Sequence, residues 1–135
     1  MEDQLAYLIA SVNRQLEDEL AETLKPEGIP IEQFRILSAL ASVDGRAMRD
    51  LAGAVLIDPA SLTKIIDRMV SDALVYRTLD PGDRRKVLIC LAAKGKALYN
   101  RLQVLHEDQQ RRLISQLSAQ KVGELAVILR GLMDR

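Results

Sequence analysis

The segment from Leu74 to Leu91 constrains the fold of this chain more than any other. Two short runs that combine β-branched and other apolar residues flank a turn at Pro81 and Gly82. Proline presets φ and glycine permits positive φ, so the segment predicts a β-hairpin with a tight reversal. Just after the turn come three consecutive cations: Arg84, Arg85 and Lys86. A solvated hairpin tip needs no such run, so these cations indicate a second role.

A helical pattern precedes the hairpin directly. Asp58 is placed to cap a helix that begins at Pro59 and continues to Ala73, since proline is favoured at the first helical position. Its inward positions recur at helical spacing: Leu62, Ile65, Ile66 and Met69. The other side carries small, polar or charged residues: Ala60, Ser61, Thr63, Lys64, Asp67 and Arg68. A short helix over 48–55 comes before it. Two helices followed by a basic hairpin predict a winged helix-turn-helix, which presents the second helix to DNA.

Apolar residues at three- and four-residue steps predict amphipathic helices on both sides of this core. One covers 5–24, and another begins at Pro30 and ends near Asp44. After the hairpin, a long helix covers 94–117, and Ser118 caps the last one. The first and last helices are apolar along one side, and a monomer this small offers them little to pack against. We therefore expect an intertwined homodimer.

The composition is that of one globular domain. The chain has 135 residues, of which 48% are hydrophobic and 28% charged. Aromatic residues make up only 3%, which disfavours nucleic-acid binding through stacking platforms. No apolar run approaches the ~20 residues of a membrane span, and the acidic N-terminus is unlike a signal peptide. The single cysteine, Cys90, excludes an internal disulfide and predicts a buried, inert thiol. We expect a cytoplasmic protein that does not contact membranes.

The formal net charge of zero conceals an uneven distribution. Residues 1–44 carry three cations against nine acids, a net charge of −6, whereas residues 45–86 carry +2 and residues 87–135 carry +4. An acidic first third and a basic remainder are compatible with a protein that turns one face toward phosphates.

Catalysis and metal binding have no motif in this sequence. His106 is the only histidine, expected to be exposed, and the carboxylates are scattered, so we predict no metal site. A Gly-rich phosphate loop and a nucleophile–base pair are also missing. We therefore expect neither an enzyme nor a cofactor.

Several short motifs occur in a specific order: Leu51-Ala52, Thr63-Lys64, Asp67-Arg68-Met69, Leu74-Val75, Asp83-Arg84-Arg85, and Leu91 followed by Gly95. In this order and spacing they resemble the MarR family of bacterial transcriptional regulators. The resemblance covers residues 1–135 as one domain. It implies a mainly α fold with a small β-hairpin wing. The winged-helix core would span about 30–92, with dimerisation helices at 1–25 and 93–135.

Two positions depart from the family pattern. The family usually has glycine where Ala73 stands, so we expect strain or a different shape at that helix exit. It usually has a capping threonine where Ala92 stands, and alanine forfeits about 1 kcal/mol of capping there. Neither departure touches the DNA-facing positions.

The resemblance implies a homodimeric repressor that binds a pseudo-palindromic operator in double-stranded DNA and releases it on binding a small molecule. It assigns DNA binding to Ala60, Ser61, Thr63, Lys64, Arg68, Arg84, Arg85 and Lys86. It also implies that Arg85 pairs with Asp67 and fixes the angle of the wing, whereas Arg84 contacts the groove. Periodicity alone is equally compatible with a solvated helix face, and hairpin cations can simply protect a sheet edge.

The resemblance also implies an effector, commonly a small aromatic or lipophilic anion, held between the dimerising helices and the helix-turn-helix. The candidate lining residues are Ile9, Phe34, Met48 and Arg49, although core packing explains the three apolar ones equally well. The alternative function is a winged-helix protein–protein adaptor that does not bind specific DNA. Such an adaptor would carry apolar or acidic residues on the wing and on the polar helix face.

Overall fold

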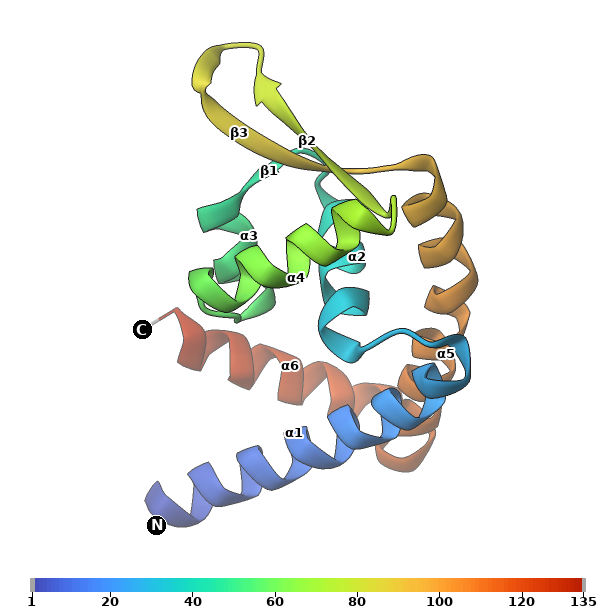
Figure 1. Cartoon of the computed structure of the whole chain (residues 1–135). Coiled ribbons are helices and arrows are strands. Elements are labelled where there is room, and N and C mark those ends of the chain that lie inside the picture. The colour runs from blue at the N-terminus through green and yellow to red at the C-terminus, as the bar shows by residue number, and fades with distance from the viewer. Residues whose placement is uncertain (1, 135) are drawn as a thin grey trace. The chain divides into compact units, whose positions relative to one another are not determined.

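The computed structural model describes the backbone of residues 2–134 and the side chains of residues 4–134, so Met1 and Arg135 of the predicted domain lie outside it. Its elements are, in order, α1 (Glu2–Leu24), the 3₁₀ turn η1 (Lys25–Glu27), α2 (Ile31–Ser42), β1 (Arg46–Ala47), α3 (Met48–Val55), α4 (Pro59–Ser71), β2 (Val75–Asp80), β3 (Asp83–Leu91), α5 (Ala93–Leu117) and α6 (Ala119–Met133) (Figure 1). The predicted fold class, mainly helical with a small β wing, is confirmed. Residues 1–103 and 104–135 form two compact units.

The core of the first unit lies where α2, α3 and α4 pack together beside the sheet. Each of these helices contributes the apolar stripe that its sequence predicts. The buried cluster comprises Ile36, Leu37, Leu40, Leu51, Ala52, Val55, Leu62, Ile66, Met69, Leu74, Val75, Ile89 and Leu91. Burial of this stripe leaves the opposite side of α4 exposed.

The sheet is antiparallel, with strand order β1-β3-β2. The hairpin β2–β3 is confirmed and projects away from the helices in Figure 1. Strand β1 was not expected, because two residues are too few to show an alternating pattern. The turn also differs from expectation: Gly82 does not adopt positive φ. Its N–H donates to Asp80 Oδ1 at 2.8 Å, so a side-chain acceptor closes the turn instead.

Helix starts follow the predicted capping residues in two of three cases. Asp58 accepts a hydrogen bond at the N-cap of α4, with Pro59 at the first helical position. Ser118 accepts from Lys121 N at 3.3 Å at the start of α6. Pro30, expected at the first position of α2, is instead its N-cap residue, because its ψ of 150° is extended rather than helical.

The end of α4 contains the backbone strain expected from the missing glycine. Ala73 has a φ of +60°, a left-handed conformation. Its N–H donates to Val70 O at 3.0 Å, and Leu74 N donates to Met69 O at 2.9 Å. This pair of bonds is the Schellman motif, in which glycine is favoured at the residue with positive φ. The end of α3 also has a residue with positive φ, since Leu56 has a φ of +58°. The Leu56 side chain is 90% exposed.

Gly95 allows α5 to approach the turn between α4 and β2. A Cβ atom at this position would lie 2.0 Å from Leu74 O, well inside van der Waals contact. The same carbonyl accepts a hydrogen bond from Ala92 N at 3.0 Å, which fixes the start of α5. Glycine is therefore required here because a side chain has no room. Backbone conformation is not the reason, since the φ of Gly95 is not positive.

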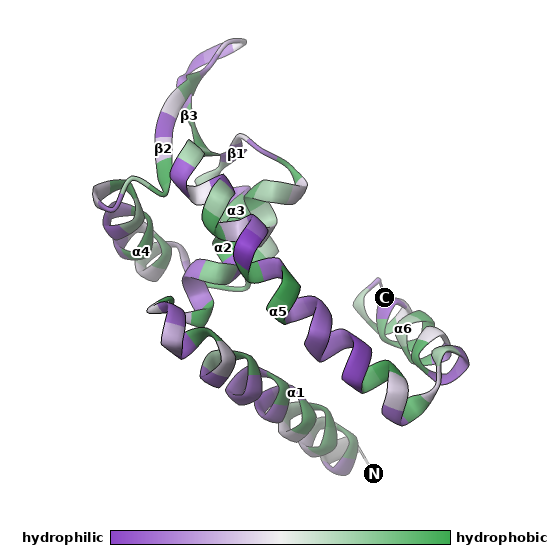
Figure 2. Cartoon of the chain, turned by 90° about the vertical axis from the view of Figure 1, so that its right-hand side faces the viewer, coloured by the Kyte–Doolittle hydropathy of each residue, from purple (hydrophilic) through white to green (hydrophobic). Residues whose placement is uncertain are grey.

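Several apolar side chains of the terminal helices remain exposed in the single chain. On α1 the predicted stripe is buried at Leu20 and Leu24, whereas Leu5, Leu8 and Val12 are more than half exposed. The predicted inward side of α6 is half-buried or exposed: Val122, Leu125, Ala126, Leu129 and Leu132. Figure 2 shows green residues along both helices. No helix among the described residues is long and apolar enough to cross a membrane.

Candidate nucleic-acid interface

The exposed face of α4 contains every helix residue that the sequence assigned to DNA. Ala60, Ser61, Thr63, Lys64 and Arg68 are all exposed, while Leu62, Ile66 and Met69 between them are buried. The 3.6-residue period of the helix produces this separation, because the apolar stripe faces the core. The structure therefore brings the five predicted residues together on one accessible surface.

The first turn of α4 is closed by its own side chains. Asp58 Oδ1 accepts from Ser61 N at 2.9 Å, and Asp58 Oδ2 accepts from Ser61 Oγ at 2.7 Å. These bonds to Ser61 hold the pKa of the Asp58 carboxyl below its ordinary value. A carboxylate at this end also interacts favourably with the helix dipole. The cap fixes the orientation of the first turn of α4.

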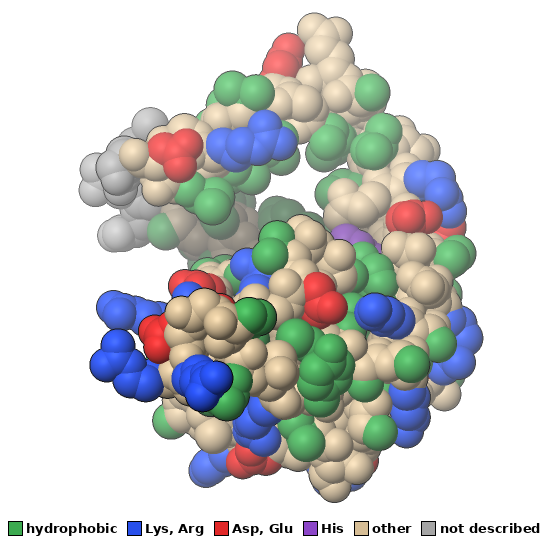
Figure 3. Space-filling model, turned by 90° about the horizontal axis from the view of Figure 1, so that it is seen from above, with side chains coloured by type: hydrophobic (Ala, Val, Ile, Leu, Met, Phe, Trp, Pro, Cys, Tyr) green, Lys and Arg blue, Asp and Glu red, His purple; other side chains and the backbone are tan. Residues whose placement is uncertain are grey.

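The wing presents its three cations to solvent. Arg84, Arg85 and Lys86 all belong to β3 and are exposed. Side chains alternate along a strand, so Arg84 and Lys86 share one face and Arg85 lies on the other. Arg85 Nε lies 3.6 Å from Asp83 Oδ1, an ion pair within the same strand face. Figure 3, viewed from above, shows blue Lys and Arg side chains on the near face with red carboxylates between them.

The predicted wing-positioning pair of Asp67 and Arg85 is wrong. Asp67 instead forms an ion pair and hydrogen bond with Arg77 of β2. The strand register explains the difference, because Arg77 lies opposite Ile89 near the base of the hairpin, whereas Arg85 lies toward its tip. Val75 and Arg77 are two residues apart in β2, so their side chains lie on the same face of the strand. Because Val75 is buried on that face, this spacing was the sequence signal that could have identified Arg77 as the partner.

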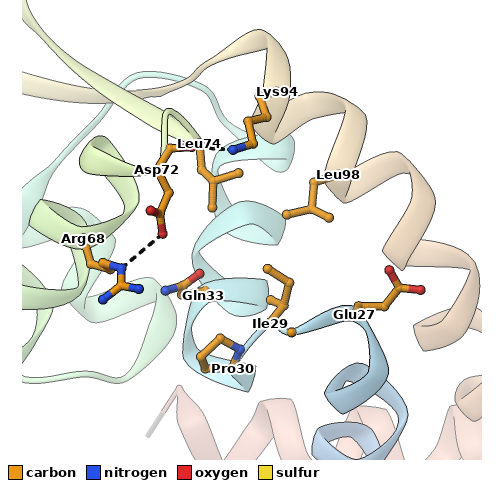
Figure 4. Close-up of a pocket in the computed structure, with 10 residues that line it drawn as sticks. Glu27, Ile29, Pro30, Gln33, Arg68, Asp72, Leu74, Lys94 and Leu98 are labelled. Atoms are coloured by element: carbon orange, nitrogen blue, oxygen red, sulfur yellow. Dashed lines mark hydrogen bonds and ion pairs between the residues drawn. The ribbon is translucent and has the colours of Figure 1, made fainter.

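A pocket borders the C-terminal end of α4 (Figure 4). Its volume is about 480 Å³, within the range of small-molecule sites. Charged and amide groups meet apolar side chains around it: Glu27, Gly28, Ile29, Pro30, Gln33, Arg68, Asp72, Leu74, Lys94 and Leu98. Arg68 Nε donates to Asp72 Oδ2 at 3.2 Å, and Lys94 Nζ donates to Asp72 O at 2.9 Å. These bonds connect the end of α4 to the start of α5.

None of the four effector residues proposed from the sequence lines this pocket. Ile9 is 51% exposed on α1, and Arg49 is exposed on α3. Phe34 is buried and stacks on Tyr99, with ring centroids 6.1 Å apart. Met48 is half-buried against the core. The sequence could not identify the pocket, because loop and helix residues far apart in the chain form it.

Cys90 is a buried free thiol, as predicted, and lies opposite Tyr76 in the hairpin register. The Cys90 group raises the pKa of the Tyr76 phenol. His106 is half-buried rather than exposed. Among the described residues, no group of three or more His, Cys, Asp or Glu side chains is placed to hold a metal ion.

Comparison with known proteins assigns this chain to a family. A family model described as MarR family matches residues 27–86. A homoprotocatechuate degradative operon repressor from Escherichia coli is 33% identical over 129 residues, covering 96% of this chain and 87% of the relative. The chain belongs to the MarR family. The multiple antibiotic resistance protein MarR of Escherichia coli is 30% identical to this MarR-family chain. The alignment covers 93% of this chain and 88% of that relative.

Solved structures of the MarR family have the same fold. A cysteine-to-serine mutant of MarR from Escherichia coli, complexed with operator DNA, has a TM-score of 0.85 at 30% identity, covering 96% of this chain and 93% of that one. The MarR-family regulator AbsC from Streptomyces coelicolor has a TM-score of 0.86 at 29% identity, covering 97% and 91%. The predicted resemblance is confirmed, and the family is one of transcriptional regulators.

Proposed function

We propose that this chain is a homodimeric transcriptional repressor that binds a pseudo-palindromic operator and releases it when a small molecule binds. The observation that carries the proposal is the pairing of an exposed polar helix face with a cationic wing. A chain of the same fold, 30% identical, has been solved with operator DNA. We assign DNA binding to residues 30–92 and dimerisation to residues 1–25 and 93–135. Because the partner is chromosomal DNA, we place the protein in the cytoplasm.

The DNA contact is proposed to use two grooves. The N-terminal half of α4 enters the major groove, as recognition helices of this class do. Arg84 and Lys86 on one face of the wing supply cations to the phosphates or to the negative potential of a narrow minor groove. A protein–protein adaptor would not need this cationic face, which is why we favour DNA over the adaptor alternative.

The dimer is proposed to cover the exposed apolar residues of the terminal helices. Leu5, Leu8, Ile9 and Val12 are each more than half exposed on α1, and Leu132 is 50% exposed on α6. Contiguous apolar exposure of this kind marks an interaction surface. A dimer also places two recognition helices about one DNA turn apart, ~34 Å, which a pseudo-palindromic operator requires. Light scattering should report twice the chain mass at micromolar concentration, and a clean monomer contradicts the proposal.

The effector is proposed to occupy the pocket at the end of α4. Arg68 and Lys94 can attract an anion, while Ile29, Leu74 and Leu98 provide apolar contact for its body. An incoming carboxylate competes with Asp72 for Arg68, which changes the link between the recognition helix and α5. Aromatic carboxylates fit this chemistry, and one relative represses an operon of homoprotocatechuate degradation.

The DNA-binding proposal is tested by titrating the protein onto DNA upstream of its own gene. We expect tighter binding to this duplex than to a scrambled one. The Arg84→Ala variant should weaken binding to both and flatten the salt dependence by about one unit of slope, as expected for one lost cation. Arg14→Ala removes the same charge from α1 and should change neither quantity. Equal affinity for both duplexes would favour the adaptor alternative.

The effector proposal is tested separately by adding homoprotocatechuate to the protein–DNA complex. Release of DNA by this carboxylate, but not by its neutral amide, supports an anion site. Ile29→Trp, which places a large side chain at the pocket wall, should retain DNA binding and lose the release. If Ile29→Trp responds like the wild type, the effector binds elsewhere.

A further inference from the structure

We propose that Lys64 is the side chain of α4 that reads the operator sequence, and that the base it recognises is guanine. This inference rests on the proposed DNA-binding function and adds to it the identity of the contact. The resemblance assigned Ser61, Thr63 and Lys64 to DNA binding without ranking them. The hydrogen bonds within α4 distinguish them.

The hydroxyl groups of Ser61 and Thr63 already donate to the protein. Ser61 Oγ donates to Asp58 Oδ2 at 2.7 Å, and Thr63 Oγ1 donates to Pro59 O at 2.9 Å. A hydroxyl has only one proton to donate, so both side chains retain only acceptor lone pairs for DNA. Neither can donate to a base acceptor unless it first breaks a bond that supports the first turn of the helix.

Lys64 is an exposed side chain in the N-terminal half of α4 whose donors remain available. Its ammonium has no hydrogen-bond or ion-pair partner among the described residues. The carboxylates nearest in sequence are occupied: Asp58 by Ser61, and Asp67 by Arg77. The Lys64 ammonium therefore does not have to leave a protein partner to reach DNA.

Arg68 is a weaker candidate for base contact. It lies in the last turn of α4, where its Nε donates to Asp72 Oδ2, and it lines the pocket at that end. Recognition helices of this class contact bases chiefly through their N-terminal residues. Lys64 is the sixth residue of the 13-residue helix and belongs to that half.

The chemistry of the ammonium group selects the base. Lysine has three donors and no acceptor. In the major groove guanine presents two neighbouring acceptors, O6 and N7, whereas adenine presents one acceptor beside an amino donor and cytosine presents an amino donor. A pure donor is best matched by the two acceptors of guanine. The operator half-site should therefore contain one guanine that is recognised by Lys64.

The test combines side-chain and single-atom changes in the same complex. Each guanine of the operator half-site is replaced in turn by 7-deazaguanine, which lacks the N7 acceptor but keeps Watson–Crick pairing. For the wild-type protein, one replacement per half-site should weaken binding by about 5- to 10-fold, toward the lower end of a base contact. Lys64→Ala should lower specific affinity by about 10-fold or more and should be insensitive to that same replacement.

Two matched variants serve as controls. Ser61→Ala and Thr63→Val remove the hydroxyls, and both should keep the wild-type sensitivity to the deaza replacement. Because Lys64 is exposed and unpaired within the described chain, Lys64→Ala should unfold at the wild-type temperature, which excludes misfolding.

The possible results distinguish failure of the Lys64–guanine contact from failure of DNA binding itself. If Lys64→Ala loses specific and nonspecific affinity equally, Lys64 contacts phosphate and the inference is overturned while DNA binding stands. If Thr63→Val or Ser61→Ala abolishes the deaza response, a hydroxyl reads the base and the inference is again overturned. If the wild-type protein prefers no duplex, both the proposed function and this inference fail.

Discussion

Replacing Ala73 by glycine should stabilise this protein, although glycine lowers the stability of most helical positions. The left-handed conformation costs an L-residue about 1–2 kcal/mol, and Ala73 adopts it with a φ of +60°. Glycine removes that strain, but it increases the conformational entropy of the unfolded chain by an amount worth about 0.4–1 kcal/mol. The strain is the larger effect. We expect Ala73→Gly to raise the free energy of unfolding by about 0.5–1 kcal/mol.

Urea unfolding followed by circular dichroism measures this difference, with all variants at one protein concentration because a dimer's stability depends on it. The matched control is Ala97→Gly, the same substitution at an exposed site inside α5 where φ is not positive. That change should lower the free energy of unfolding by about 1 kcal/mol. If Ala73→Gly destabilises the protein as much as Ala97→Gly does, the strain assigned to the α4 exit is not present.

Three further changes test other parts of the structure. Gly95→Ala should destabilise the protein by about 2 kcal/mol in the same unfolding assay, because a Cβ atom has no room against a backbone carbonyl, and an unchanged midpoint would contradict this packing. A double-mutant cycle of Asp67→Ala and Arg77→Ala should give a coupling of about 0.5 kcal/mol, as for other partly exposed ion pairs, whereas strict additivity would show no interaction. The hydrogen bond from Arg35 lowers the pKa of Glu17. The contribution of this bond to the free energy of unfolding is therefore complete above the ordinary Glu pKa of about 4.3, and it is lost as the pH falls through the lowered value. Glu17→Gln should therefore lose less stability than the wild type between pH 6 and pH 3, and equal losses would contradict the assignment.

The helices and the hairpin could be predicted because their signals are local. The apolar stripe of α4, the Asp58–Pro59 start and the Pro81-Gly82 turn each depend on residues within a few positions of one another. The strain at Ala73 was also expected, since a single missing glycine signals it. Local patterns of this kind fix the elements and the exposed face of α4.

The contacts between elements could not be predicted, because they depend on register and packing. The partner of Asp67 is Arg77 rather than Arg85, since the pairing of β2 with β3 decides which cation lies near the helix. Strand β1 is too short to carry a periodic signal. The hydrogen bonds that commit Ser61 and Thr63 to their own helix depend on rotamers that a sequence does not reveal.

The most direct test of the central claim is a footprint of the protein on the DNA upstream of its own gene, with the stoichiometry measured on the same duplex. The proposed homodimer should protect two half-sites related by pseudo-twofold symmetry, with centres about one helical turn apart, ~34 Å, and two chains bound per duplex. Protection should disappear on a scrambled duplex at the same salt concentration. Binding of one chain per duplex, or protection that does not depend on sequence, would contradict a dimeric repressor that reads its operator through α4 and the wing.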